Sequence, residues 1–114
     1  MDYKDLLVWQ AAIDLCEVTY RSTDAFPRRE VFGLTAQLRK SAVSVPSNIA
    51  EGEGRLTLGE RRQFLSQARG SLFELETQFI IAERVGYLDA KSVLAEVNAA
   101  RKRLDGYIAY VKRR

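Results

Sequence analysis

Arginine and lysine side chains are the residues of this chain whose spacing best suits a chemical role, and that role is the binding of a polyanion. Residues 101–114 carry six basic side chains against Asp105 alone, whereas residues 1–100 carry 12 basic and 14 acidic side chains. Arg62 and Arg69 are seven residues apart, which on a helix places them along one edge, about two turns from each other. Such spacings can follow a phosphate backbone, although an ordinary solvated basic surface explains the same pattern.

The residues predicted to bind nucleic acid come from the third and fourth expected helices and from the residues next to them. Tyr110, near Arg103, is placed to stack on a base if it is exposed. Acidic neighbours such as Glu60, Glu74 and Asp105 would neutralise part of the charge. The predicted set is Arg55, Arg61, Arg62, Arg69, Arg101, Lys102, Arg103, Lys112, Arg113 and Arg114.

Side chains that catalyse reactions are poorly represented. The chain has no histidine, the commonest general base near neutral pH and the commonest transition-metal ligand. Cys16 is the only cysteine, and its place on an apolar stripe favours a buried thiol over a nucleophile. Glu74 and Glu76 are two residues apart and diverge on a helix, so surface carboxylates are favoured over a magnesium site. The sequence predicts a non-catalytic protein without metal or cofactor.

Apolar side chains recur every three and four residues along four segments, which predicts four helices and no strand. The expected helices span about residues 5–23, 28–52, 58–85 and 90–112. Their short connections force successive helices to lie antiparallel. The chain of 114 residues is therefore predicted to form one all-α domain over residues 1–114, an up-down-up-down antiparallel four-helix bundle.

Local signals mark several helix ends. Thr57 followed by Glu60 has the form of a capping box, Gly86 is expected to end the third helix, and Asp89 is expected to cap the fourth. Pro46 lies inside the second helix and should bend it unless local hydroxyl groups compensate. The hydroxyl groups near it belong to Ser41, Ser44 and Ser47.

Each expected helix has one apolar stripe for the core. The stripes are Trp9, Ile13, Cys16 and Tyr20; Val31, Leu34, Leu38, Ala42, Val45 and Ile49; Leu65, Ala68, Leu72, Leu75, Phe79 and Ala82; and Val93, Val97, Ala100, Leu104, Tyr107 and Val111. Helices one and three carry further apolar residues that point elsewhere. These residues predict a subunit interface, with a wide monomeric core as the alternative. They are Leu7, Val8, Ala11, Leu15, Val18, Phe73 and Ile80.

Neither terminus suggests export or a membrane span. A single cysteine excludes an internal disulfide, and residues 1–5 are acidic and polar where a secretory signal would be basic and then apolar. The longest uncharged stretch, residues 41–50, is far shorter than the roughly 20 apolar residues of a membrane helix. A cytoplasmic protein without membrane contact is expected.

A motif in the second expected helix goes further than composition. The run GLTAQLRKSAVSVPSNIAEG, residues 33–52, resembles the signature of the bacterial four-helix-bundle proteins encoded in intervening sequences of large-subunit ribosomal RNA genes. The similarity extends to YKDL with VW near the N-terminus, to FP at 26–27, to FL at 64–65, to GS at 70–71 and to ELET at 74–77. It covers roughly residues 3–90. The signature residues are Arg39, Pro46, Ser47, Asn48, Glu51 and Gly52.

This resemblance implies a homopentameric ring of four-helix bundles. The family includes the accessory variability determinant of diversity-generating retroelements, which associates with a reverse transcriptase and with nucleic acid. By analogy, Arg39, Lys40, Ser47, Asn48 and Glu51 would form a recognition surface. A structural role is the alternative, in which Ser47 and Asn48 satisfy carbonyls freed by Pro46 and Glu51 pairs with Arg39 or Lys40.

Two hypotheses of function remain open. The leading one is a pentameric accessory protein that binds RNA or DNA through its basic surface, with a reverse transcriptase as the protein partner that the resemblance implies. The other is a scaffold ring that binds only proteins, with the basic residues serving solubility.

Overall fold

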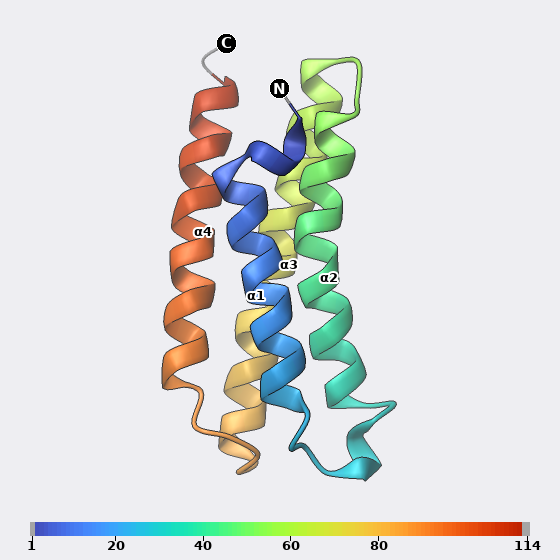
Figure 1. Ribbon diagram of the computed structural model, residues 1–114, viewed down its shortest axis with the longest axis vertical. Helices are drawn as coiled ribbons and strands as arrows, with labels where there is room; N and C mark the ends of the chain where they lie inside the picture. The colour runs from blue at the N-terminus through green and yellow to red at the C-terminus, as the bar shows by residue number, and fades with distance from the viewer. Residues whose placement is uncertain (1, 113–114) are drawn as a thin grey trace.

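Four helices form the chain in the computed structural model, which describes residues 2–112 (Figure 1). They are α1 (Leu7–Thr23), α2 (Leu34–Glu53), α3 (Leu58–Arg84) and α4 (Lys91–Lys112), with short 3-10 turns η1 (Tyr3–Asp5) and η2 (Arg28–Glu30). Each helix packs against the next, and α4 packs against α1. Residues 2–112 contain no strand. The predicted all-α, up-down-up-down bundle is confirmed, and it measures 45 × 24 × 20 Å.

Local signals set the ends of α3 and α4 as predicted. Thr57 Oγ1 accepts a hydrogen bond from the backbone N–H of Glu60 at 3.2 Å, where α3 begins. Gly86, just beyond α3, has φ of +87°, a left-handed conformation that glycine adopts without strain. Asp89 Oδ1 accepts from the N–H of Lys91 at 3.0 Å, where α4 begins.

The start of α2 differs from the prediction, whereas the other helix ends agree within two residues. The predicted range was 28–52, but α2 begins at Leu34 because Gly33, with φ −107° and ψ −117°, interrupts the helical backbone. Glu30 Oε1 accepts from the N–H of Leu34 at 3.1 Å, so this carboxylate caps α2 from outside the helix. Val31, placed in the core stripe by its spacing, is consequently exposed.

The apolar stripes of α3 and α4 form the core as predicted, with Tyr107 half-buried and the rest of both stripes buried. In α2 the stripe from Leu38 to Ile49 is buried too. Leu34, at the first turn of α2, is half-buried. These three helices follow apolar spacing because most of their core positions are occupied by aliphatic and aromatic side chains, with Thr35, Ser41 and Ser71 as buried polar exceptions.

α1 buries a different face from the one predicted. Ile13 and Tyr20 are exposed, and Trp9 and Cys16 are only half-buried. The buried residues of α1 are Val8, Ala12, Leu15, Thr19 and Thr23. The two threonine hydroxyls donate to the backbone carbonyls four residues earlier, at 2.8 and 2.9 Å. Because these hydroxyls are satisfied within the helix, they are buried without an unpaired polar group, and the core face includes polar residue types.

Small residues bring α2 and α3 close together. A Cβ atom on Gly52 would stand 3.1 Å from the Cβ of Phe64 on α3, so only glycine fits this approach comfortably. Farther along the seam, the hydroxyls of Ser44 and Ser71 are hydrogen-bonded at 2.8 Å. α2 continues through the buried Pro46. This seam fixes α3, which carries part of the basic surface described below.

Candidate nucleic-acid interface

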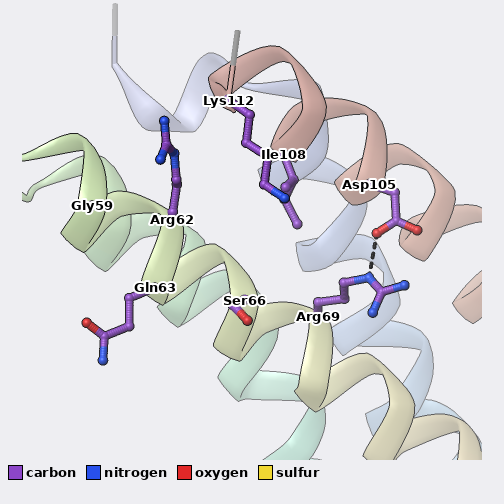
Figure 2. A pocket seen from close by; sticks show the side chains of 8 residues that line it. All are labelled: Gly59, Arg62, Gln63, Ser66, Arg69, Asp105, Ile108 and Lys112. Atoms are coloured by element: carbon purple, nitrogen blue, oxygen red, sulfur yellow. Dashed lines mark hydrogen bonds and ion pairs between the residues drawn. The ribbon is translucent and has the colours of Figure 1, made fainter. Parts of the chain in front are cut away.

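A groove of 640 Å³ lies between α3 and α4 and gathers basic side chains from both helices. Figure 2 shows Arg62 and Arg69 on α3 and Lys112 on α4 around this groove. The remaining lining residues are Gly59, Gln63, Ser66, Asp105 and Ile108. The seven-residue spacing of the two arginines therefore places both on the edge of α3 that faces α4, as the sequence predicted for a shared edge.

Asp105 partly neutralises the groove. Its Oδ1 lies 2.7 Å from Arg69 Nε, the ion pair that is drawn in Figure 2, and its Oδ2 lies 3.5 Å from Arg101. Both guanidinium groups also lie over the ring of Phe73, at 4.9 and 5.8 Å from its centroid. These contacts hold Arg69 and Arg101 in place, so they present a fixed cationic surface at little entropic cost.

Arg62 and Lys112 are the exposed cations of the groove. Within residues 2–112 neither forms an ion pair with a carboxylate. Their charges are therefore available to an anion from solution, because no internal partner competes for them.

Two predicted phosphate-binding arginines have internal partners instead. Arg61, predicted to contact solvent or phosphate, is directed into the bundle and lies 3.6 Å from Glu53. Its Nε is buried without a hydrogen bond. Glu53 also accepts a hydrogen bond from the Tyr107 hydroxyl at 2.9 Å. Arg55 pairs with Glu51 at 2.7 Å and lies over the ring of Phe64. The prediction for Arg61 is wrong, because the end of α2 brings an acidic residue beside it.

The remaining predicted cations are dispersed. Lys102 is exposed outside the groove, and Arg103 lies on the opposite side of α4, in depressions that α4 forms with α1. Tyr110 is half exposed and stacks on Tyr107, with ring centroids 6.1 Å apart. Arg113 and Arg114 lie outside the described residues. The structure thus collects only part of the predicted set on one surface.

The signature residues of α2 have mainly structural contacts. Arg39 reaches back to α1, where it donates to Thr23 Oγ1 at 2.9 Å and pairs with Asp24 at 3.2 Å. The expected pairing of Glu51 with Arg39 or Lys40 is therefore wrong, since Glu51 is held by the arginine four residues later. Arg39 is thus a link between α1 and α2.

Asn48 is a structural residue, although not in the way predicted. Its Nδ2 donates to the backbone carbonyl and the hydroxyl of Ser44, at 2.8 and 2.9 Å. The carbonyl freed by Pro46 is that of Ala42, which Asn48 does not reach. Ser47 is exposed.

Of the seven residues predicted to form a subunit interface, two are buried inside the bundle and three are exposed. Val8 and Leu15 are buried in the bundle core, so they cannot contact another subunit. Leu7, Phe73 and Ile80 are exposed. The other two predicted residues are half-buried: Ala11 and Val18.

Several of the exposed apolar residues of the bundle lie on two opposite edges. Ile13 and Val43 line a depression between α1 and α2, beside the exposed Tyr20. Phe73 and Ile80, one heptad apart on α3, lie on the side facing α4, where the arginines cover Phe73. Because the helices are arranged in chain order around the bundle, the α1–α2 pair is opposite the α3–α4 pair.

Catalytic and metal chemistry find little support in the described residues. Within residues 2–112 no group of three or more acidic, cysteine or histidine side chains is placed to hold a metal ion. Burial raises the pKa of the Cys16 thiol, which makes it a poorer nucleophile at neutral pH. In the same part of the chain, no helix is long and apolar enough for a membrane crossing.

Comparison with known proteins gives a family and a fold. Residues 4–106 match the family described as 23S rRNA-intervening sequence protein. A similar solved structure is the 1.70 Å crystal structure of a protein with unknown function from the S23 ribosomal protein family of Bacteroides thetaiotaomicron VPI-5482. The two chains share 18% identity with a TM-score of 0.79, over 90% of this chain and 98% of the other. No curated protein matches the chain.

Proposed function

The chain belongs to the 23S rRNA-intervening sequence protein family, and on this premise we propose that it is a non-catalytic accessory protein that binds RNA or DNA in the α3–α4 groove. The observation that carries the proposal is the convergence of Arg62, Arg69 and Lys112 on one groove. Phosphate groups meet these three cations, whose attraction does not depend on base sequence. The protein thus holds nucleic acid by charge.

The proposed assembly is a homopentameric ring. Two observations support a repeated head-to-tail contact: apolar residues on the α1–α2 edge, such as Ile13, and Ile80 on α3, which lies beyond the groove-lining residues 59–69 of that helix. Different patches on opposite edges pair heterologously, and such contacts close into a ring when the rotation between subunits is right. The number five comes from the family resemblance alone.

A protein partner is the second candidate function. The exposed apolar edges favour it, because contiguous apolar surface usually marks protein association. A reverse transcriptase is the partner that the family resemblance suggests. In this alternative, the ring is a scaffold and the groove cations serve solubility. It predicts a complex with the partner that survives nuclease treatment.

Titration of a labelled RNA hairpin and a DNA duplex at two salt concentrations tests the nucleic-acid proposal. With three cations engaged, raising the salt fourfold should weaken duplex binding by roughly 40-fold. The variant Arg62→Gln/Arg69→Gln/Lys112→Gln should lose most of this binding. The matched control Lys4→Gln/Arg84→Gln/Lys91→Gln removes the same charge from exposed cations elsewhere and should bind like the unaltered protein. Equal losses in both variants, or no binding at low salt, would refute the proposal.

A further inference from the structure

The turn between η2 and α2 presents an aromatic ring almost wholly to solvent. Phe32 is 94% exposed and its neighbour Val31 is 53% exposed. Both belong to the turn at residues 31–33, outside the packed faces of the four helices. A ring this open contributes almost nothing to the core of its own subunit, so its surface is free for a contact with another molecule.

The segment that carries this ring is fixed on both sides. Glu30 Oε1 accepts from the N–H of Leu34 at 3.1 Å, and Glu30 Oε2 accepts from the hydroxyl of Tyr87 at 2.6 Å. The ring of Tyr87 packs on Phe26, with centroids 5.2 Å apart. These contacts tie the turn to the link between α3 and α4. Phe32 is therefore held out by a braced turn, which lowers the entropic cost of using it in binding.

Positive charge accompanies the exposed ring. Arg28 is exposed at the start of η2, and Arg29 lies at the hydroxyl of Tyr87. Asp24 pairs with Arg39, and Glu30 keeps its negative charge because both of its hydrogen-bond donors are neutral. Arg28 and Arg29 against Glu30 give residues 28–33 a net charge of +1. The charge around Phe32 thus favours an anionic partner over a cationic one.

We propose that residues 28–33 form a second nucleic-acid contact, in which Phe32 stacks on an unpaired base and Arg28 meets an adjoining phosphate. This inference rests on the proposed function. A flat ring flanked by a guanidinium group is the combination that binds single strands without reading their sequence. The bases of a duplex cover one another's faces, so this contact selects single-stranded RNA or DNA.

The second contact is separate from the groove. Figure 1 shows η2 at the opposite end of the bundle from the end where α3 begins and α4 finishes, which is where Arg62 and Lys112 lie. A duplex held in the groove therefore does not need Phe32. A nucleic acid with both paired and unpaired segments can use both sites.

Binding of single-stranded RNA that carries a 2-aminopurine base tests this inference, with a duplex of the same length measured beside it. Phe32→Ala should weaken single-strand binding by about 5-fold to 150-fold, the range of one lost base–aromatic stack, and leave duplex binding unchanged. Phe32→Trp should retain binding and the fluorescence change of 2-aminopurine. The matched control is Leu56→Ala, at a side chain 99% exposed in the α2–α3 link, and it should bind both like the unaltered protein.

Three results would overturn the inference. One is single-strand binding by Phe32→Ala equal to that of the unaltered protein. The second is an equal loss in Leu56→Ala, which would indicate a general effect of exposed apolar surface. The third is a loss of binding to anionic phospholipid vesicles in Phe32→Ala without a loss on RNA. None of these results bears on the groove proposal, which stands if the unaltered protein binds the duplex. If the unaltered protein does not bind the duplex, the groove proposal is refuted.

Discussion

Replacing Asp105 with asparagine should tighten the binding of nucleic acid in the α3–α4 groove. The carboxylate of Asp105 lies 2.7 Å from Arg69 and 3.5 Å from Arg101, so it neutralises one of these two charges, and its removal leaves one more guanidinium group for a phosphate. Asparagine has nearly the same shape and keeps one oxygen acceptor, but it carries no charge. Because exposed ion pairs contribute at most about 1 kcal/mol each, the bundle should remain folded.

The size of the effect follows from counterion release. One additional phosphate contact steepens the dependence of log K on log salt by about 0.9 for a duplex. If this contribution vanishes near 1 M salt, Asp105→Asn gains about 15-fold in affinity at 50 mM salt and about 4-fold at 200 mM salt. The gain should therefore shrink as the salt concentration rises.

Fluorescence anisotropy with a labelled duplex at both salt concentrations measures this gain. The control is Glu96→Gln, which removes the same charge from the side of α4 that faces α1. An equal gain in both variants would mean that only the net charge of the protein matters. Unchanged or weaker binding by Asp105→Asn would refute the placement of the nucleic acid beside Asp105.

The remaining predictions concern the core, the assembly and pH. Gly52→Val should lower the free energy of unfolding in urea by roughly 1–3 kcal/mol, because α3 already crowds this position; an unchanged midpoint would contradict the close approach. Leu15→Ala should cost about 2–5 kcal/mol in the same assay. Ile13→Ala should instead lower the mass of the assembly, which light scattering measures. An unchanged mass would contradict a subunit contact at the α1–α2 edge. Hydrogen bonds from Tyr87 and the backbone hold the pKa of Glu30 below its usual 4.5. The charged carboxylate therefore stabilises the fold fully above pH 4.5, and this stabilisation is lost as the pH falls through the lower folded pKa. Glu30→Gln should make Tm fall less steeply in acid, and a fall identical to that of the unaltered protein would contradict this role of Glu30.

The sequence predicted three of the four core faces because α2, α3 and α4 bury mainly apolar side chains. It failed on α1 because Thr19 and Thr23 are core residues whose hydroxyls bond to their own helix. Hydropathy spacing counts such residues as polar and moves the stripe to the neighbouring face, which here includes Ile13 and Tyr20. The two threonines four residues apart, Thr19 and Thr23, were the signal that indicated the correct face.

In the candidate site, the sequence predicted which residues are neighbours on one helix but not which residues meet between two helices. Arg62 and Arg69 share an edge because both lie on α3, and their seven-residue spacing is visible in the sequence. The pairing of Arg69 with Asp105 depends on how α3 and α4 are aligned, so the sequence named Asp105 only as one of several possible neutralising residues. The contact of Arg61 with Glu53 depends on the geometry of the α2–α3 link, which spacing does not encode.

Photo-crosslinking to RNA that contains 4-thiouridine, followed by mass spectrometry of tryptic peptides, tests most directly where the nucleic acid binds. The groove borders two such peptides, residues 63–69 of α3 and residues 104–112 of α4. We expect crosslinks in both. In Arg62→Gln/Arg69→Gln/Lys112→Gln, which lacks these cleavage sites, the same segments lie in the tryptic peptides 62–84 and 104–113, and we expect no crosslinks in either. Crosslinks confined to α1 and to the tryptic peptide 41–55, which covers most of α2 and the start of its link to α3, with neither groove peptide modified, would contradict the account.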